Sequence, residues 1–247
     1  MPTQIQIDER TTVRQLVGRH PETRPVFEKY EIDYCCGGAR SLADAAAGCN
    51  LQVADLVEVL AEAVETAATT AETPERDWYA APLDELVEHI VSTHHSYVRT
   101  ALPRLRSLIS KVLNAHRESH GDMLTRVQAY VGALDSELSS HMMKEEQVLF
   151  PYIVALESYH REEAARPQAP FGTIRNPVRQ MEHEHETAGN ALTGLREVTG
   201  DYSLPDDACP TFETLYQELE RFEGDLHQHI HLENNILFPR AIELESA

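Results

Sequence analysis

Two short segments of the sequence carry histidine and glutamate at the same spacing. Residues 141–151 read His-Met-Met-Lys-Glu-Glu-Gln-Val-Leu-Phe-Pro, and residues 229–239 read His-Ile-His-Leu-Glu-Asn-Asn-Ile-Leu-Phe-Pro. In each, the glutamate follows the histidine by four positions, which on a helix places the imidazole and the carboxylate on one face, one turn apart. The apolar residues upstream of the two segments match as well. The repeat therefore predicts a pseudo-two-fold site of nitrogen and oxygen donors.

The apolar residues around each repeat indicate which way these donors point. At about 100° per residue, His141 and Glu145 fall on the apolar stripe of their helix. His229 and Glu233 do the same on theirs. Both carboxylates thus face an apolar core, where an unpaired charge costs several kcal/mol. Few basic residues share these faces, so a metal is the most economical partner, with a polar core network as the alternative.

Two further helices each contribute one inward histidine. His185 lies near the centre of the apolar stripe of the third predicted helix, while His183 points the opposite way. A core histidine satisfied by hydrogen bonds is the alternative for His185. On the first predicted helix, the phase slightly favours His94 over His95, and both remain candidates on this ground.

The remaining histidines are predicted to lie in solvent. His227 and His231 fall off the apolar face of the fourth predicted helix. The others predicted to be solvated are His20, His89, His116, His120 and His160. Mixed imidazole and carboxylate donors suit iron or manganese, and also zinc. Because the predicted bundle core offers no thiolate, a site of the zinc-finger type is not expected there.

Long amphipathic helices must position these donors. Apolar residues recur at three- and four-residue spacing over four stretches, and no alternating strand pattern is present, which predicts an all-α protein with an antiparallel four-helix bundle. The four stretches are residues 82–116, 121–158, 172–199 and 209–243. We predict three parts: a small N-terminal helical domain over residues 1–66, a linker over 67–77 and the bundle over 78–247.

Composition excludes several classes of function. The formal net charge is −20, which argues against nucleic-acid binding and against binding to anionic membranes. No run of about 18 apolar residues is present, so no transmembrane helix is expected. Four cysteines do not make a disulfide framework. These features predict a reduced, cytoplasmic protein.

A cysteine pair stands in the N-terminal domain, in the sequence Asp-Tyr-Cys-Cys-Gly-Gly of residues 33–38. Cys35 and Cys36 are adjacent, a geometry that rarely supports a disulfide. One interpretation is a tight turn with incidental thiols; the other is a redox-active or metal-binding pair whose thiol pKa is lowered by the helix that follows. Cys49 and Cys209 are predicted to be packing residues.

The order of these motifs resembles the hemerythrin-like family, and within it the repair-of-iron-centres (YtfE/ScdA-type) di-iron proteins. The resemblance rests on the cysteine motif of residues 33–38, on the two Leu-Phe-Pro segments and on the histidine and glutamate pattern. It implies a hemerythrin-like bundle with two non-haem Fe ions, bridged by carboxylates and, when oxidised, by an oxo group. The ligands that it implies are His95, His141, Glu145, His185, His229 and Glu233.

The resemblance also implies a function in the stress response. The expected function is repair of iron–sulfur clusters damaged by nitrosative or oxidative stress, through supply of iron, with Cys35 and Cys36 assisting in redox chemistry or iron transfer. Damaged or apo iron–sulfur proteins are then the partners, nitric oxide is a candidate ligand, and a homodimer is left open. The alternatives are an enzyme that binds or reduces nitric oxide at the metals and an oxygen sensor or carrier.

Overall fold

Helices form the regular structure of the computed structural model, which describes residues 7–70, 76–162 and 164–247. Over these ranges there is no β-strand, only an isolated β-bridge between Thr12 and Ser41. The chain divides into two compact units, Met1–Pro82 with Ile230–Pro239, and Leu83–His229 with Arg240–Ala247. The all-α prediction is confirmed.

The N-terminal residues form short helices whose ends follow local sequence signals. Thr12 begins the first through a capping box with Gln15, and the Ser41 hydroxyl caps the third by accepting from the Asp44 N–H at 3.1 Å. The buried core of this part includes Leu16, Phe27, Leu42, Leu56 and Leu60. The helices are α1 (Val13–Arg19), α2 (Arg24–Lys29), α3 (Leu42–Gly48) and α4 (Val53–Thr70).

The last of these helices is longer than its sequence pattern suggested. Helix α4 runs to Thr70 and so enters the segment predicted as linker, residues 67–77. Alanine and glutamate dominate its second half, and both have high helix propensity. Residues 71–75 of the predicted linker lie outside the described residues.

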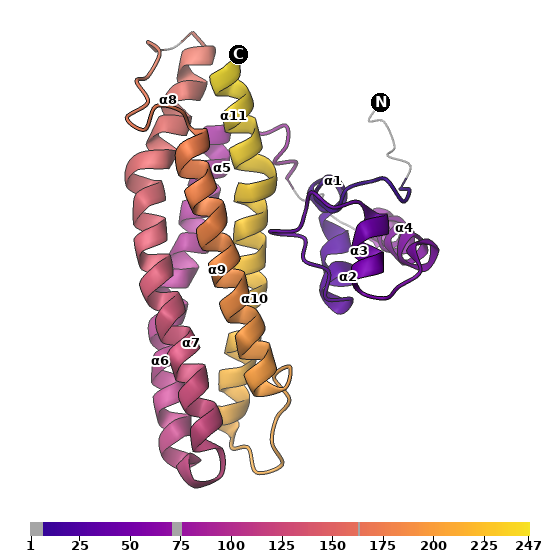
Figure 1. Cartoon of the computed structure of the whole chain (residues 1–247), viewed down its shortest axis with the longest axis vertical. Helices are drawn as coiled ribbons and strands as arrows, with labels where there is room; N and C mark the ends of the chain where they lie inside the picture. The colour runs from indigo at the N-terminus through magenta and orange to yellow at the C-terminus, as the bar shows by residue number, and fades with distance from the viewer. Residues whose placement is uncertain (1–6, 71–75, 163) are drawn as a thin grey trace. The chain divides into compact units, whose positions relative to one another are not determined.

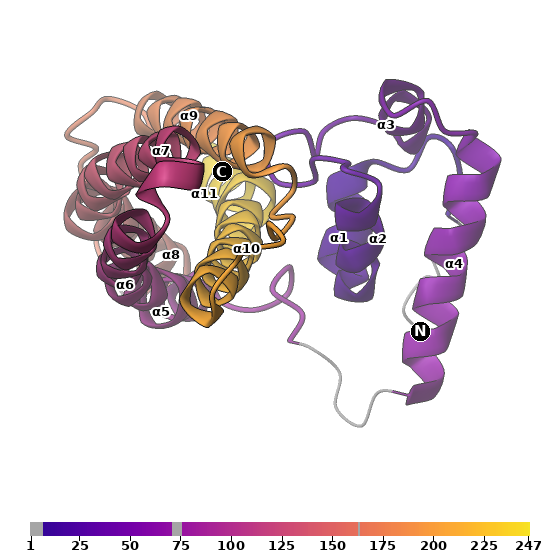
Figure 2. The same cartoon turned by 90° about the horizontal axis from the view of Figure 1, so that it is seen from below.

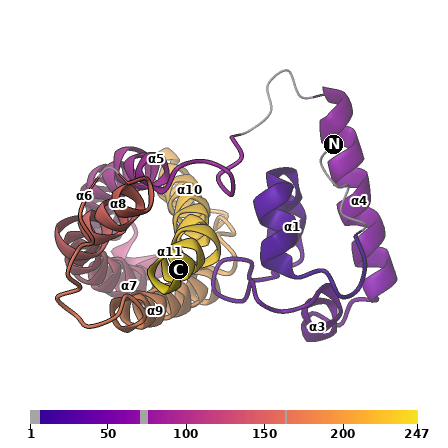
Figure 3. The same ribbon diagram turned by 90° about the horizontal axis from the view of Figure 1, so that it is seen from above.

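Four long helices form the bundle, and they alternate in direction along its length (Figure 1). Viewed from below and from above, they surround a common axis (Figures 2 and 3). The first consists of α5 (Leu83–His89), a π-helical turn (Ile90–His95) and α6 (Ser96–Ala115). The second consists of α7 (Arg117–Lys144), a π-turn (Glu145–Leu149) and α8 (Phe150–His160). The third is α9 (Arg175–Thr199), and the fourth consists of α10 (Pro210–Leu232), a π-turn (Glu233–Leu237) and α11 (Phe238–Ser246).

The two Leu-Phe-Pro segments continue their helices, although a proline commonly ends or kinks a helix. Pro151 and Pro239 each lie in the first turn of the helix that follows a π-turn. In these turns the N–H of Phe150 bonds the carbonyl of Glu145, and that of Phe238 bonds the carbonyl of Glu233, five residues back. The wider turn accommodates a ring that cannot donate to the ordinary helix ladder.

A buried carboxylate holds the start of the first bundle helix. The Glu157 carboxylate of α8 accepts the backbone N–H of Leu83 at 2.9 Å and that of Asp84 at 3.0 Å. Arg161 binds the same carboxylate at 3.2 Å. These contacts satisfy N–H groups that have no partner within the helix.

Replacing Glu157 is expected to destabilise the bundle. Glu157→Ala leaves two N–H groups at the start of α5 without their acceptors, which should lower the free energy of unfolding by about 1–3 kcal/mol. Chemical denaturation followed by circular dichroism measures the change. Glu137→Ala, at an exposed position of α7, is the matched control, and equal stability of the two variants would contradict this role.

Candidate metal centre

The six predicted ligands come together in the interior of the bundle. They form two groups of four residues, and within each group one ligand atom per residue lies within 4.8 Å of the others. Both groups contain Glu145 and Glu233, so the two carboxylates are common to them. One group adds His95 and His229, and the other adds His141 and His185.

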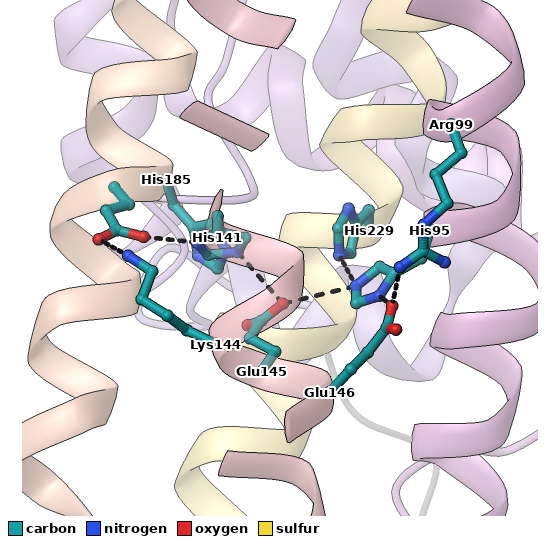
Figure 4. A network of polar contacts seen from close by, with 9 residues as sticks. His95, Arg99, His141, Lys144, Glu145, Glu146, His185 and His229 are labelled. Carbon is teal, nitrogen blue, oxygen red and sulfur yellow. Dashed lines mark hydrogen bonds and ion pairs between the residues drawn. The ribbon is translucent and has the colours of Figure 1, made fainter. Parts of the chain in front are cut away.

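The imidazoles face one another in pairs on either side of Glu145 (Figure 4). The Nε2 atoms of His95 and His229 are 3.1 Å apart, and those of His141 and His185 are 3.0 Å apart. Glu145 Oε2 lies 3.4 Å from His95 Nε2 and 3.3 Å from His141 Nε2. Glu145 therefore stands between the two pairs, and all five side chains are almost completely buried.

Carboxylates outside the pairs orient two of the imidazoles. His95 Nδ1 lies 2.6 Å from Glu146 Oε1, and His141 Nδ1 lies 2.9 Å from Glu184 Oε2. An ionised carboxylate can only accept, so each Nδ1 carries the proton and donates it. In the neutral ring, Nε2 then presents its lone pair to the interior. This carboxylate–histidine arrangement is the usual support of a metal-binding imidazole.

Basic side chains at the edge of the bundle keep these outer carboxylates ionised. Arg99 donates to Glu146 at 2.6 Å, and Lys144 donates to Glu184. Burial raises the pKa of Glu146, but the hydrogen bonds from its histidine partner and from Arg99 outweigh burial and leave this pKa below its usual value. The hydrogen bond from its own histidine partner, opposed by burial and aided by Lys144, lowers the pKa of Glu184 to about 2.

The donor chemistry fits divalent cations. With Nδ1 protonated on His95 and His141, their Nε2 lone pairs both face the Glu145 carboxylate, an arrangement of acceptors against an acceptor. A cation or an additional proton must lie among them. Four carboxylates surround the pairs, namely those of Glu145, Glu233, Glu146 and Glu184, and their formal charge of −4 equals in size the charge of two divalent ions.

The structure brings His95 rather than His94 into the ligand groups. His94 Nδ1 lies 3.0 Å from Asp225 Oδ1, and its ring stacks on that of His229 at 5.7 Å between centroids. Both histidines lie in the π-turn Ile90–His95. Helix phase assigns directions on the basis of a regular α-helix of about 3.6 residues per turn. The wider π-turn rotates the side chains away from those directions.

The prediction that His231 is exposed is wrong. Its side chain is buried, its Nδ1 lies 3.0 Å from the Asn235 amide, and the edge of its ring packs against Tyr34 at 5.9 Å. Burial lowers the pKa of His231 to about 3. Periodicity within α10 does not reveal this burial because Tyr34 is far away in the sequence. His183, by contrast, is exposed as predicted.

The Cys35–Cys36 pair lies in a turn organised by Asp33. Its carboxylate oxygen Oδ1 accepts the backbone N–H groups of both cysteines at 3.0 and 2.9 Å and lies 3.2 Å from Cys35 Sγ. The two Sγ atoms are 3.8 Å apart, Cys35 is buried and Cys36 is exposed. A Cβ added at Gly38 would lie 2.9 Å from the Tyr34 carbonyl oxygen, so the turn requires glycine there.

The expectation of a lowered thiol pKa does not hold for Cys35. The hydrogen bond with Cys36, together with burial and the nearby Asp33 carboxylate, raises the pKa of Cys35 well above its usual value. The helix that follows the motif begins only at Leu42. Its N-terminus does not dominate the environment of this thiol.

Sequence reasoning missed the outer carboxylates and the π-turns. Glu146 and Glu184 are direct neighbours of the predicted ligands Glu145 and His185. A charged residue beside an inward ligand, at the edge of the apolar stripe, was a usable signal. The π-turns at Glu145–Leu149 and Glu233–Leu237 had a weaker signal, a Leu-Phe-Pro sequence with no glycine or polar loop after it to end the helix.

Comparison with known proteins assigns both parts of the chain. Residues 86–241 match the hemerythrin HHE cation-binding domain, and residues 9–64 match the ScdA_N domain, a domain of unknown function (DUF542). The iron–sulfur cluster repair protein YtfE of Escherichia coli O81 (strain ED1a) is 38% identical over 222 residues, which cover 90% of this chain and 92% of the relative. The protein of the same name from Escherichia fergusonii shows the same identity and coverage. The chain belongs to the YtfE family.

Membership of the YtfE family indicates that the buried cluster of histidines and glutamates is an iron-binding site. The hemerythrin match spans all six residues of the two ligand groups. Among the described residues, no helix is both long and apolar enough to cross a bilayer. The division at residues 66 and 78 stays a prediction, since the matched domains end at residue 64 and begin at residue 86.

Removing the charge of an outer carboxylate should weaken metal binding. We expect Glu184→Gln to lower the affinity for iron by about 10–100-fold, because the amide supports the His141 imidazole less strongly. Competition with a chromophoric chelator measures the affinity. Glu186→Gln, at a side chain on α9 that is 70% exposed, is the control, and an unchanged affinity in Glu184→Gln would refute the role of this carboxylate.

Proposed function

We propose that this chain repairs iron–sulfur clusters damaged by nitric oxide or peroxide, and that it does so by supplying iron. The observation that supports this most directly is the pair of ligand groups that share Glu145 and Glu233. Relatives that match nearly the whole chain carry the name iron–sulfur cluster repair protein. The reducing cytoplasm is the proposed compartment, in keeping with four free cysteines.

Two iron ions are the proposed cargo. His95 and His229 would hold one iron, His141 and His185 would hold the other, and Glu145 and Glu233 would bridge them. Bound there, iron supplies a redox-active and exchangeable metal. Four neutral imidazoles bring less negative charge than a carboxylate-rich site, so the site favours ferrous or mixed-valent iron over two ferric ions. Iron in the lower oxidation state exchanges its ligands more readily, as a donor of iron requires.

The cysteine pair is the proposed assistant in iron transfer. Ligand atoms of Asp33, Cys35 and Cys36 lie within 4.8 Å of one another, so they form a small group with thiol and carboxylate donors. Cys36 is exposed and can meet a client protein, while Cys35 is buried. We propose that the pair accepts iron or electrons, or docks the client. The proposed domain that carries it covers residues 1–66.

Binding of nitric oxide is the second candidate function. A cleft of about 480 Å³ is lined by residues that include Tyr97, Arg221 and Asp225. Asp225 contacts His94, whose ring stacks on His229, so the cleft lies beside one of the proposed ligands. A diatomic molecule is small enough for such a route. Multiple-turnover formation of nitrous oxide in anaerobic stopped-flow experiments favours an enzyme, and uptake of a single equivalent favours a ligand.

Iron content tests the centre itself. Glu233→Ala removes a ligand common to both groups and should reduce iron from about two ions per chain to one or none. Iron analysis and visible absorption after aerobic purification measure this. Glu243→Ala, at an exposed position of α11, is the control. Less than one iron in the wild-type chain, without oxo-bridge bands, would sink the di-iron proposal and favour a polar core network.

Repair itself needs a client. A [4Fe–4S] dehydratase inactivated with nitric oxide should regain activity with the iron-loaded chain under reducing conditions, and it should not with Glu233→Ala. Cys35→Ser/Cys36→Ser should keep its iron yet transfer it more slowly. Recovery that is equal for all three proteins would mean that free iron in solution does the repair. The oligomeric state is read in the same samples by light scattering, which tests the proposed homodimer.

A pair of histidine variants tests the first-helix ligand. His95→Ala should lose about half of the iron, because one group then lacks an imidazole. His94→Ala should retain its iron, because His94 contacts Asp225 instead. The reverse result would show that the bound metal draws His94 into the site. Metal analysis of the purified variants decides between these outcomes.

A further inference from the structure

A second group of metal-binding side chains lies where α6 meets α7. His116 separates the two helices, and His120 follows one turn later on α7. Histidines four residues apart present their rings on the same side of a helical turn. The loop after α9 brings Asp207 and Cys209 to the same place, just before α10 begins. None of these residues belongs to the ligand groups described above.

The donor atoms of this group are close together. His120 Nε2 lies 2.7 Å from Asp207 Oδ1, and His116 Nδ1 lies 3.9 Å from Asp207 Oδ2. Ligand atoms of the two histidines and the aspartate fall within 4.8 Å of one another. Cys209 follows Asp207 by two residues and is partly exposed, so a thiol stands next to this group in the sequence. Ligands around one zinc ion stand at comparable separations.

Neighbouring residues hold these donors in position. The rings of His116 and His120 pack edge-on against the buried Phe212, with centroids 5.3 and 5.8 Å away. The Ser119 hydroxyl donates to Asp207 Oδ2 at 3.2 Å. The prediction that these histidines are simply solvated is therefore wrong, since both are partly buried and ordered by contacts from α7 and α10.

Cys209 has the properties of a metal-binding thiol. Its pKa is lowered, first by the hydrogen bond with His116 and then by backbone N–H groups of Phe212 and Thr211 at the start of α10. The thiolate is the form that binds metals. Packing alone, which the sequence suggested for Cys209, does not account for a partly exposed thiol whose pKa is lowered by the His116 side chain.

We propose that His116, His120, Asp207 and Cys209 form a mononuclear site for zinc. Two imidazoles, a carboxylate and a thiolate supply the tetrahedral, mixed nitrogen, oxygen and sulfur set that zinc prefers. The site differs in kind from the iron centre, which contains no sulfur donor. Bound zinc would link the loop between α9 and α10 to the junction of α6 and α7. It would thereby stabilise the end of the bundle at which both connections lie.

A hydrogen-bonded ion pair is the competing explanation. The contact between His120 and Asp207 alone would attach the loop without a metal. It gives no reason for His116 to stand beside the second oxygen of the same carboxylate. The zinc site uses all four side chains. The two explanations differ in whether the chain takes up a metal that depends on Cys209.

Metal uptake by the iron-loaded full-length chain tests the proposal. After equilibration with buffered zinc, elemental analysis should find about one zinc per chain with the iron unchanged. Cobalt in place of zinc should give a thiolate-to-cobalt charge-transfer absorption. Cys209→Ser should abolish this absorption and weaken zinc binding at least about tenfold, because replacing a ligand should cost no less than disturbing its support. His120→Ala should weaken binding to a similar extent.

Matched variants keep the test decisive. Cys49→Ser changes another partly exposed thiol, and His183→Ala changes a side chain that is 71% exposed. Both should bind zinc as the wild-type chain does. The absence of any zinc beyond the iron, or equal uptake by Cys209→Ser, His120→Ala and the controls, would overturn the site. Circular dichroism confirms that the conservative Cys209→Ser variant is folded, so that loss of zinc cannot be attributed to unfolding.

Discussion

Glu145 and Glu233 place two carboxylates in the apolar interior of a four-helix bundle, where neither side chain is exposed to solvent. Removing a carboxylate from water costs several kcal/mol, and the neighbours that lie within ligand distance of these two are histidines. The Nε2 lone pair of a neutral imidazole needs a hydrogen-bond donor or a cation, and an ionised carboxylate is neither. The need for positive charge at this point therefore governs which side chains surround it, and it explains why the outer carboxylates bind imidazoles on the far side of the rings.

The two shared glutamates lie where their helices depart from regular α-helical geometry. Each shared glutamate is the first residue of a π-turn, and its own carbonyl accepts the bond from the phenylalanine five residues later. The turn fits the following proline without breaking the helix. It also carries the Phe150 ring onto His95, where the centroids are 5.7 Å apart. The Leu-Phe-Pro segments thus support the site, and their repetition reflects the repetition of the ligands.

The sequence predicted the parts of this protein that depend on a single helix. The bundle helices, the shared glutamates and the histidines four residues before them all follow from periodicity, and each lies where the pattern placed it. The failures involve partners that are distant in the sequence. His231 is buried by Tyr34, and His116 meets a loop that begins more than eighty residues later. Helix phase alone slightly favoured His94 over His95 for a local reason, because the π-turn changes the angle per residue.

The distribution of charge around the centre suits a protein that releases its metal. Inside, four imidazoles contribute no negative charge and two carboxylates are shared, so half of the formal charge that would balance the two proposed ferrous ions comes from Glu146 and Glu184. These outer side chains are 26% and 22% exposed, whereas Glu145 and Glu233 are sealed from solvent. Water and salt screen the outer carboxylates but not the inner ones. Under the proposed function, the buried carboxylates would fix the position of the iron. The outer, solvent-accessible carboxylates would hold it less tightly, which suits the supply of iron to a damaged cluster.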